Sequence, residues 1–326
     1  MKSSRRSFIE KNLLLLPGIL AGIVQKSDAA TWSAKLSSKK FLSEDGFKIN
    51  VFSKCLQWLN IKDMAKLVSE MGYHGIDLTV RPNGHVQPEH AMKDLPEAVD
   101  TIRKTGLEVY MITTSIHNPA DPVSIEILKT ASTLGIKHYR MDWLYYDQAK
   151  TIKENIRCIT EQMLRLAELN QKYQIAGEYQ NHSGDYFGSA IWDLYEALDN
   201  IRSSWLGIQY DIYHATIEGT NSWKTGLKLV APCIKSLAIK DFCWSEKDGR
   251  CFPEAVPLGE GMIDFREFFS LVKKYRISGP ISMHFEYPLG GAESGAKTIS
   301  ISPDIVVENM RRDLDKLKRM LLDAGL

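Results

Sequence analysis

Four segments of this chain place carboxylate, imidazole and amine side chains directly after short apolar runs. They are residues 178–182, 209–214, 238–241 and 282–286. Carboxylates and imidazoles can move protons or bind metal ions, and an amine can stabilise a developing negative charge. One charged strand end usually marks only where the chain meets water. Four in succession instead predict a shared pocket at the ends of neighbouring strands.

Alternating strand and helix patterns must position these segments. Apolar residues spaced by three and four, such as Ile152, Ile156 and Ile159, predict helices between the strands. Strict alternation predicts a parallel sheet covered by helices, and eight repeats predict a single-domain (β/α)₈ barrel. An open doubly wound sheet is the alternative, but residues 52–57 lack its glycine-rich phosphate turn. The expected strands are residues 48–52, 75–80, 107–113, 137–143, 175–180, 206–211, 236–240 and 281–286.

Composition permits a large core and restricts the classes of partner. Hydrophobic residues make up 44% and charged residues 25% of the chain, as in ordinary globular proteins. The net charge of +1 gives no general attraction to nucleic acid or to an anionic membrane. The number of cysteines is odd, and Cys243 and Cys251 lie in one expected loop, where an oxidising compartment would allow a disulfide. We expect a small-molecule substrate, and a homo-oligomer is compatible with the sequence.

The first 29 residues are typical of an export signal. Arg5 and Arg6 precede an apolar stretch at residues 13–24, and small residues lie just before position 30. This layout resembles a twin-arginine signal. The apolar stretch is shorter than the roughly 20 residues that span a bilayer. We therefore expect a signal at 1–29, an extension at 30–46 and the barrel at 47–326, with a periplasmic location and no stable membrane anchor after cleavage.

The strand-end motifs resemble those of the xylose-isomerase-like TIM barrel superfamily of sugar phosphate isomerases and epimerases. The resemblance covers about residues 47–325 and is closest to an exported, twin-arginine-signalled branch. It rests on the residues after strands five to eight and on the loop before the seventh helix, which are residues 179–184, 211–214, 240–242, 286–288 and 257–264. It implies carbohydrate metabolism and a divalent metal held by Glu, Asp, His and Glu from strands five, six, seven and eight.

Two of the implied metal ligands match residues of this chain directly, namely Asp211 and Glu286. Glu178 is the acid of the fifth strand. Gln180 is the alternative match, because it lies two residues further along the same face. The resemblance therefore supports an acidic site at the ends of strands six and eight and leaves the fifth-strand ligand open between two positions.

The seventh strand departs from the family pattern. Ala238 stands where the family has histidine, and Lys240 on the same face would repel a cation. His284 alternates with Glu286 and is the substitute ligand. The resemblance thus implies a metal-binding set that suits Mn²⁺, Mg²⁺ or Zn²⁺ about equally. Its members are Glu178, Asp211, His284 and Glu286.

The same residues predict a reaction. A metal on a sugar carbonyl would stabilise the enediolate formed when a proton leaves the neighbouring carbon. Glu178 or Glu286 is the expected base, and Lys240 could stabilise an oxyanion. His214 completes the catalytic set, where it would hold hydroxyl groups or move protons. The expected substrate-binding residues are Gln180, His182, His214, Lys240, Trp143 and Trp244.

Three functions remain open from the sequence. The first is a sugar isomerase or epimerase. The second is a lyase or hydrolase acting on 3-keto-glycosides or other oxidised sugars, in which the same proton removal would expel a leaving group. The third is a non-catalytic carbohydrate-binding barrel with a decayed metal site, which Ala238 permits. An endonuclease is disfavoured, because the chain is nearly neutral and shows no basic stripe.

Overall fold

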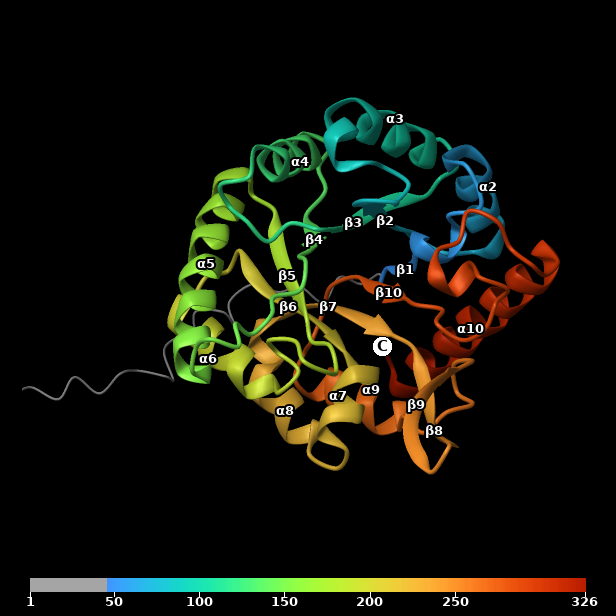
Figure 1. Ribbon diagram of the computed structural model, residues 1–326. Helices are drawn as coiled ribbons and strands as arrows, with labels where there is room; N and C mark the ends of the chain where they lie inside the picture. The colour runs from blue at the N-terminus through green and yellow to red at the C-terminus, as the bar shows by residue number, and fades with distance from the viewer. Residues whose placement is uncertain (1–45) are drawn as a thin grey trace, which may run out of the picture. The chain divides into compact units, whose positions relative to one another are not determined.

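Eight parallel strands form a closed barrel surrounded by helices (Figure 1). The computed structural model describes residues 46–326, so the expected signal at 1–29 and nearly all of the extension lie outside the described residues. The order around the barrel is β1-β10-β7-β6-β5-β4-β3-β2. The predicted (β/α)₈ barrel is confirmed. The strands are β1 (Ile49–Phe52), β2 (Gly75–Val80), β3 (Glu108–Thr114), β4 (His138–Arg140), β5 (Ala176–Gln180), β6 (Leu206–Asp211), β7 (Ile234–Ile239) and β10 (Ile281–Met283).

Helices between the strands form the outer layer in Figure 1. Their ends follow local sequence signals. Thr151 and Glu154 form a reciprocal capping box at the start of α5, and α2 ends at Gly72, whose φ of 85° is the left-handed conformation that favours glycine. The helices are α2 (Ile61–Met71), α3 (Ala91–Arg103), α4 (Pro122–Thr133), α5 (Ile152–Tyr173), α6 (Ile191–Ile201), α7 (Ile212–Gly219), α8 (Trp223–Val230), α9 (Phe265–Lys274) and α10 (Pro303–Ala324), with short 3₁₀ turns η1 (Ser53–Leu56), η2 (Pro88–His90), η3 (Ala231–Cys233) and η4 (Ala292–Ser294).

Side chains on each strand alternate between the barrel interior and the helical layer. In β2, Ile76 and Leu78 are fully buried against the helices, while Asp77 points into the barrel. There Asp77 accepts hydrogen bonds from Thr113 of β3 at 2.9 Å and from Ser282 of β10 at 2.7 Å. The barrel interior is therefore partly polar, and its polar groups are satisfied by partners from several strands.

An antiparallel hairpin follows β7 where the sequence predicted a loop. It consists of β8 (Asp241–Lys247) and β9 (Arg250–Val256). Its turn contains Asp248 and Gly249 with φ values of 54° and 70°, as in a type I′ hairpin turn. Cys243 lies opposite Glu254, and Cys251 lies opposite Glu246, so the two cysteines project from opposite faces of the hairpin. Both are free thiols, and the disulfide considered for them is not formed.

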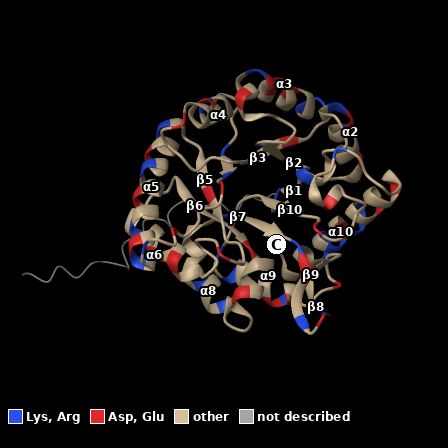
Figure 2. Ribbon diagram, viewed as in Figure 1, with Lys and Arg blue, Asp and Glu red and all other residues tan. Residues whose placement is uncertain are grey.

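The outer helices carry mixed charges. Figure 2 shows basic and acidic residues interspersed along them, in keeping with the near-zero net charge of the chain. Among residues 46–326, no helix has both the length and the apolar character required to cross a membrane.

Candidate active site at the carboxyl ends of the strands

A buried lysine lies at the centre of the site. Lys240 follows β7 directly, and its side chain is only 3% exposed. Its Nζ lies 3.3 Å from Asp211 Oδ2, at the end of β6, and 3.1 Å from Glu286 Oε2, just beyond β10. It also lies 2.9 Å from Nε2 of His214, in the first turn of α7. Because β7 lies between β6 and β10 in the barrel, three adjacent strand ends bring these groups together.

Hydrogen-bond chemistry fixes the tautomer of His214. A lysine ammonium can only donate, so His214 Nε2 must accept from Lys240. His214 Nδ1 then carries the proton and donates to Ser183 Oγ at 2.9 Å. Burial and, next, the charge of Lys240 hold the pKa of His214 well below its ordinary value. His214 is therefore a neutral imidazole at neutral pH.

An amide links Asp211 to an arginine. Gln180 Nε2 donates to Asp211 Oδ2 at 2.7 Å, and Gln180 Oε1 accepts from Arg140 Nη1 at 2.8 Å. The other Asp211 oxygen accepts from the backbone N–H groups of Tyr213 and His214 and so caps α7. Gln180 thus presents an N–H, rather than a lone pair, to the neighbouring carboxylate.

Opposing electrostatic effects set the charges of the central groups. Burial disfavours the ammonium of Lys240, but Asp211 and Glu286 outweigh this effect and raise its pKa. Burial would raise the pKa of Glu286, but Lys240 and then Lys54 hold that pKa far below its ordinary range. Burial raises the pKa of Asp211, and Lys240 limits the rise. The centre is thus one ammonium between two carboxylates.

His182 lies at the edge of this centre. Its ring centroid is 3.8 Å from that of His214 and 4.7 Å from that of Trp143. Its Nδ1 donates to the carbonyl oxygen of Ser183 at 2.8 Å, because a carbonyl can only accept. Burial, followed by Lys240, lowers the pKa of His182 to about 4. The neutral ring therefore keeps its lone pair on Nε2, where it can accept a proton.

Glu178, an expected base and metal ligand, lies deeper in the barrel. It shares a face with Gln180 but precedes it by two residues, so it occupies the next layer below the mouth. Its carboxylate contacts His138 Nδ1 at 2.5 Å and the hydroxyl of Ser236. The structure thus does not bring Glu178 to Asp211 or Glu286.

The two predicted tryptophans lie in different settings. Trp143 packs against His182 and lies 5.1 Å from the guanidinium carbon of Arg140, measured to the ring centroid. Trp244 lies on β8, is 44% exposed, and contacts the ring of Phe242. Trp143 is therefore part of the site, whereas Trp244 lies on the hairpin beside it.

The residues at the expected metal position do not fit a divalent cation. The ammonium of Lys240 already lies between the Asp211 and Glu286 carboxylates, and Gln180 donates where a ligand would accept. His284 Nδ1 is 3.9 Å from Glu286 Oε1, and its ring stacks on another side chain, Phe52. Within residues 46–326, no group of three His, Cys, Asp or Glu side chains is arranged to hold a metal ion.

Several site residues were not identified from the sequence. Arg140 ends β4, Phe52 ends β1, and Lys54 and Arg81 lie in the turns after β1 and β2. The signal that could have found them is the strand-end rule itself, applied to the first four strands as well as to the last four. Ser183 needed the structure, because its role depends on the position of His214.

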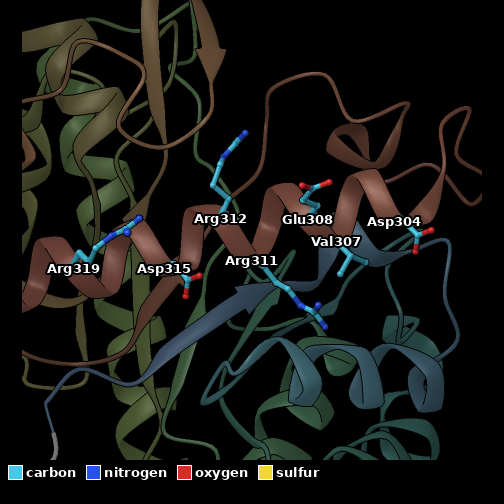
Figure 3. A pocket seen from close by; sticks show the side chains of 7 residues that line it. All are labelled: Asp304, Val307, Glu308, Arg311, Arg312, Asp315 and Arg319. Atoms are coloured by element: carbon cyan, nitrogen blue, oxygen red, sulfur yellow. The ribbon is translucent and has the colours of Figure 1, made fainter.

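A hollow along α10 does not resemble a site. It is lined mainly by charged side chains of that one helix. Figure 3 shows that Arg311 and Arg312 point in opposite directions and that the labelled side chains do not converge on a common point. We therefore assign the chemistry to the barrel mouth.

Comparison with known proteins defines the class of this barrel. Residues 65–311 match the xylose isomerase-like TIM barrel family, and the chain belongs to that family. No curated protein shows a significant match.

Similar solved structures include a xylose isomerase domain protein from Planctomyces limnophilus (14% identity, TM-score 0.63, covering 86% of this chain and 99% of that one). A second is 3-keto-D-glucoside 4-epimerase from E. coli, with 14% identity and a TM-score of 0.63, covering 84% of this chain and 100% of that one. A third is D-allulose 3-epimerase from Methylomonas sp. in complex with D-allulose, with 15% identity and a TM-score of 0.62, covering 84% of this chain and 97% of that one. Others contain magnesium or zinc, and one is a probable dehydratase. At these identities the likeness shows the fold alone.

Proposed function

We propose that this protein is an isomerase or epimerase of carbohydrate metabolism that removes a proton from the carbon next to a sugar carbonyl. The observation that supports the proposal is the ammonium of Lys240, buried at the barrel mouth between Asp211 and Glu286. A fixed positive charge in a water-poor site stabilises the negative charge that develops on a carbonyl oxygen when the adjacent carbon loses a proton. In this proposal, Lys240 supplies the charge that a divalent metal was expected to supply.

Lys240 can reach a substrate oxygen by exchanging one hydrogen bond. Its three donors are directed at Asp211, Glu286 and His214. The bond to neutral His214 is the least costly to replace, because in the other two both the donor and the acceptor are charged. A carbonyl oxygen of the substrate would therefore take the place of His214 Nε2, which is then free to accept a hydrogen bond from a sugar hydroxyl.

His182 is the best-placed proton acceptor. Among residues 46–326 its Nε2 has no hydrogen-bond partner, and its pKa of about 4 is nearer to neutral pH than that of Glu286. Catalysis by a base is more efficient when its pKa is close to the operating pH. Glu286, whose side chain is 29% exposed, would hold substrate hydroxyl groups and keep Lys240 charged.

The test is proton exchange at the carbon next to the carbonyl. Aldoses, ketoses and 3-keto-glycosides are incubated in D₂O with chelator-treated protein, and NMR measures deuterium at that carbon. We expect a turned-over sugar to gain deuterium, and His182→Gln to slow the exchange by roughly 100-fold, as for loss of a general base. The matched control is His90→Gln, which removes an exposed histidine at the start of α3.

The products distinguish the alternative functions. Exchange with an intact, rearranged sugar supports an isomerase or epimerase, whereas exchange with release of the aglycone indicates a lyase. Sugar binding without exchange indicates a non-catalytic barrel. Turnover with neither exchange nor a primary isotope effect from α-deuterated substrate would contradict the proposed chemistry.

A further inference from the structure

A second charged cluster lies beside the first at the barrel mouth, at the ends of β1, β2 and β4. The ring of Phe52 is its centre. The guanidinium carbons of Arg81 and Arg140 each lie 5.4 Å from the ring centroid, and Nζ of Lys54 lies 6.0 Å from it. These side chains come from the ends of β1 and β4 and from the turns after β1 and β2. Three cations thus converge on one aromatic ring.

The hydrogen-bonding capacity of these cations is largely unused. Arg140 is 4% exposed and donates from Nη1 to Gln180, but its buried Nε has no partner. Among residues 46–326, the Arg81 guanidinium contacts the Phe52 ring and is influenced by the charges of Asp77, Asp142 and Glu286, but it forms no ion pair or hydrogen bond. The buried Nε1 of Trp143, whose ring adjoins Arg140, also lacks a partner. Buried donors without partners are costly, so their presence together indicates a ligand that supplies oxygen acceptors.

The nearby acids do not neutralise the cluster. Glu286 is engaged by Lys240 and lies 3.6 Å from Lys54. Asp77 is bound by two hydroxyl groups inside the barrel. Burial and, next, the charge of Arg81 lower the pKa of Arg140 to about 10, in keeping with two guanidinium groups that lie over the same ring. Asp142 also acts on both guanidinium groups, but its side chain is 39% exposed and lies 3.6 Å from His117. The acids near the cluster are therefore shared with other groups or with solvent, and within the described part of the chain the buried Nε of Arg140 keeps no acceptor.

We propose that Arg81 and Arg140 bind an anionic oxygen group, a carboxylate or a phosphate, carried by the substrate. Guanidinium groups suit these anions because their planar N–H donors match pairs of oxygens. The inference deepens the proposed function, on which it rests for the identity of the sugar: the substrate would be a sugar acid or sugar phosphate rather than a neutral sugar. The anionic group would sit over Phe52, and the carbonyl end would reach Lys240.

The first experiment uses small anions, so that it depends on neither the stereochemistry of the sugar nor turnover. Protein labelled with ¹⁵N-arginine is titrated with inorganic phosphate and with acetate at constant ionic strength, and the Nε–H signals of Arg81 and Arg140 are followed. We expect saturable shifts of both signals at millimolar anion. Arg81→Gln should abolish the shift of Arg140, whereas Arg311→Gln, on exposed α10, should leave it unchanged. Signals that do not respond to either anion would overturn the proposal.

The second experiment separates the two sources of the anion. Calorimetry compares D-glucuronate, D-glucose 6-phosphate and D-glucose on the wild type, Arg81→Gln and Arg311→Gln. We expect one charged sugar to bind at least about tenfold more tightly than D-glucose, an advantage that Arg81→Gln removes. Preference for the uronate identifies a sugar acid, and preference for the phosphate identifies a phosphosugar. Equal binding of all three sugars, or no binding of any, would overturn the inference.

The two proposals fail in different ways. Anion binding without any proton exchange would remove the catalytic proposal and leave the anion site standing. Proton exchange that is equally fast on neutral and charged sugars, and that Arg81→Gln does not change for either, would leave the catalytic proposal standing and remove the anion site.

Discussion

The charge of Lys240 is stabilised by one fully buried carboxylate, Asp211, and by one that is 29% exposed, Glu286. Asp211 is fully buried, and the amide of Gln180 completes its hydrogen bonding. Removal of one charged side chain from such a cluster leaves the opposite charge buried without a partner. The resulting loss of folding free energy is far larger than that caused by breaking an ion pair on the surface. The stability of the fold and the proposed catalysis should therefore both depend on the Lys240 side chain.

The first prediction is that Lys240→Met lowers activity by at least about 100-fold and the free energy of unfolding by about 3–5 kcal/mol. The reason is that Asp211 and Glu286 lose their shared cation. Denaturant unfolding and turnover measure the two effects. The double variant Asp211→Asn/Lys240→Met should recover part of the stability, because an amide needs no counter-charge. Lys235→Met is the control, since Lys235 lies on β7 but faces away from the barrel interior. Equal losses in the two single variants would contradict this prediction.

The second prediction concerns acid. The pKa of His182 falls from 6.5 in the unfolded chain to about 4 in the folded protein, so the unfolded chain binds more protons between these values. Its contribution therefore favours folding above pH 6.5 and is lost as the pH falls toward 4. We expect His182→Gln to lose less stability than the wild type when the pH is lowered from 7 to 4.5. Parallel stability curves for the two proteins, measured by urea unfolding, would argue against this assignment.

At the scale of elements, the hairpin is tied to the site through its first residue. Asp241 follows Lys240 and accepts backbone hydrogen bonds from Gly259 and Gly261 at 2.9 and 3.0 Å. A Cβ atom at Gly261 would lie 2.2 Å from Asp241 Oδ1 and 2.3 Å from the carbonyl oxygen of Phe242. No rotation of a flexible side chain can relieve the second contact.

The third prediction is that Gly261→Ala displaces Asp241 and its neighbour Lys240, with about 2–3 kcal/mol of destabilisation and a marked loss of activity. The control is Gly106→Ala. Gly106 has a φ of 83°, but a Cβ atom there would meet no other atom. Gly106→Ala therefore measures the effect of backbone strain alone, about 1 kcal/mol, at a site far from the barrel mouth. Full activity in Gly261→Ala, measured alongside the thermal unfolding of both variants, would show that the loop does not position Lys240.

The strands were predictable because their apolar runs and flanking glycines are local signals. The predicted bounds of β2 and β6 match the structure, whereas β10 ends at Met283, three residues before the predicted end. Beyond that point the backbone N–H of His284 still donates to the carbonyl oxygen of Ile239 in β7 at 3.0 Å, and the side chains of His284 and Glu286 contact Phe52 and Lys240. The hairpin was missed although Asp248-Gly249 is a strong turn signal, because its strands are mostly exposed and its one apolar run, residues 242–244, is short.

The membership of the site was predictable in part, and its arrangement was not. Asp211, Lys240, His214 and Glu286 do meet, as the strand ends indicated. The depth of Glu178 depends on strand stagger, which the order of residues does not reveal. The central place of Lys240 depends on the balance between burial and two carboxylates, which becomes apparent only in three dimensions.

At the scale of the whole molecule, the fourth prediction concerns metal content. Equilibrium dialysis against Mn²⁺, Mg²⁺ or Zn²⁺ should give no stoichiometric binding at the barrel mouth, because Lys240 repels a cation there. Elemental analysis of the dialysed protein measures the bound metal. If the wild type binds stoichiometric metal and the Asp211→Ala/Glu286→Ala variant does not, the divalent metal site expected from the sequence would be supported instead. Lys240→Met provides a positive control, since its free carboxylates should bind Mn²⁺ more strongly than those of the wild type.

The fifth prediction is that residues 1–29 direct export to the periplasm, with the mature chain beginning near Ala30. Arg5 and Arg6 precede a weakly apolar stretch in that segment, which lies outside the described residues. Replacement of both arginines by lysine should leave the protein in the cytoplasm, as measured by cell fractionation. Undiminished export of the variant would contradict the twin-arginine interpretation.

A cation that is part of the polypeptide cannot dissociate. Lys240 arrives with the chain, so competence for catalysis would require neither loading from a metal pool nor protection from scavengers that strip metals from their binding sites. The ammonium carries one positive charge, whereas a divalent ion carries two. Lys240 therefore polarises a carbonyl group less strongly than a bound divalent metal ion would. Under the proposed mechanism, the barrel would therefore need no metal supply but would act best on substrates whose protons are already acidified by a neighbouring ketone.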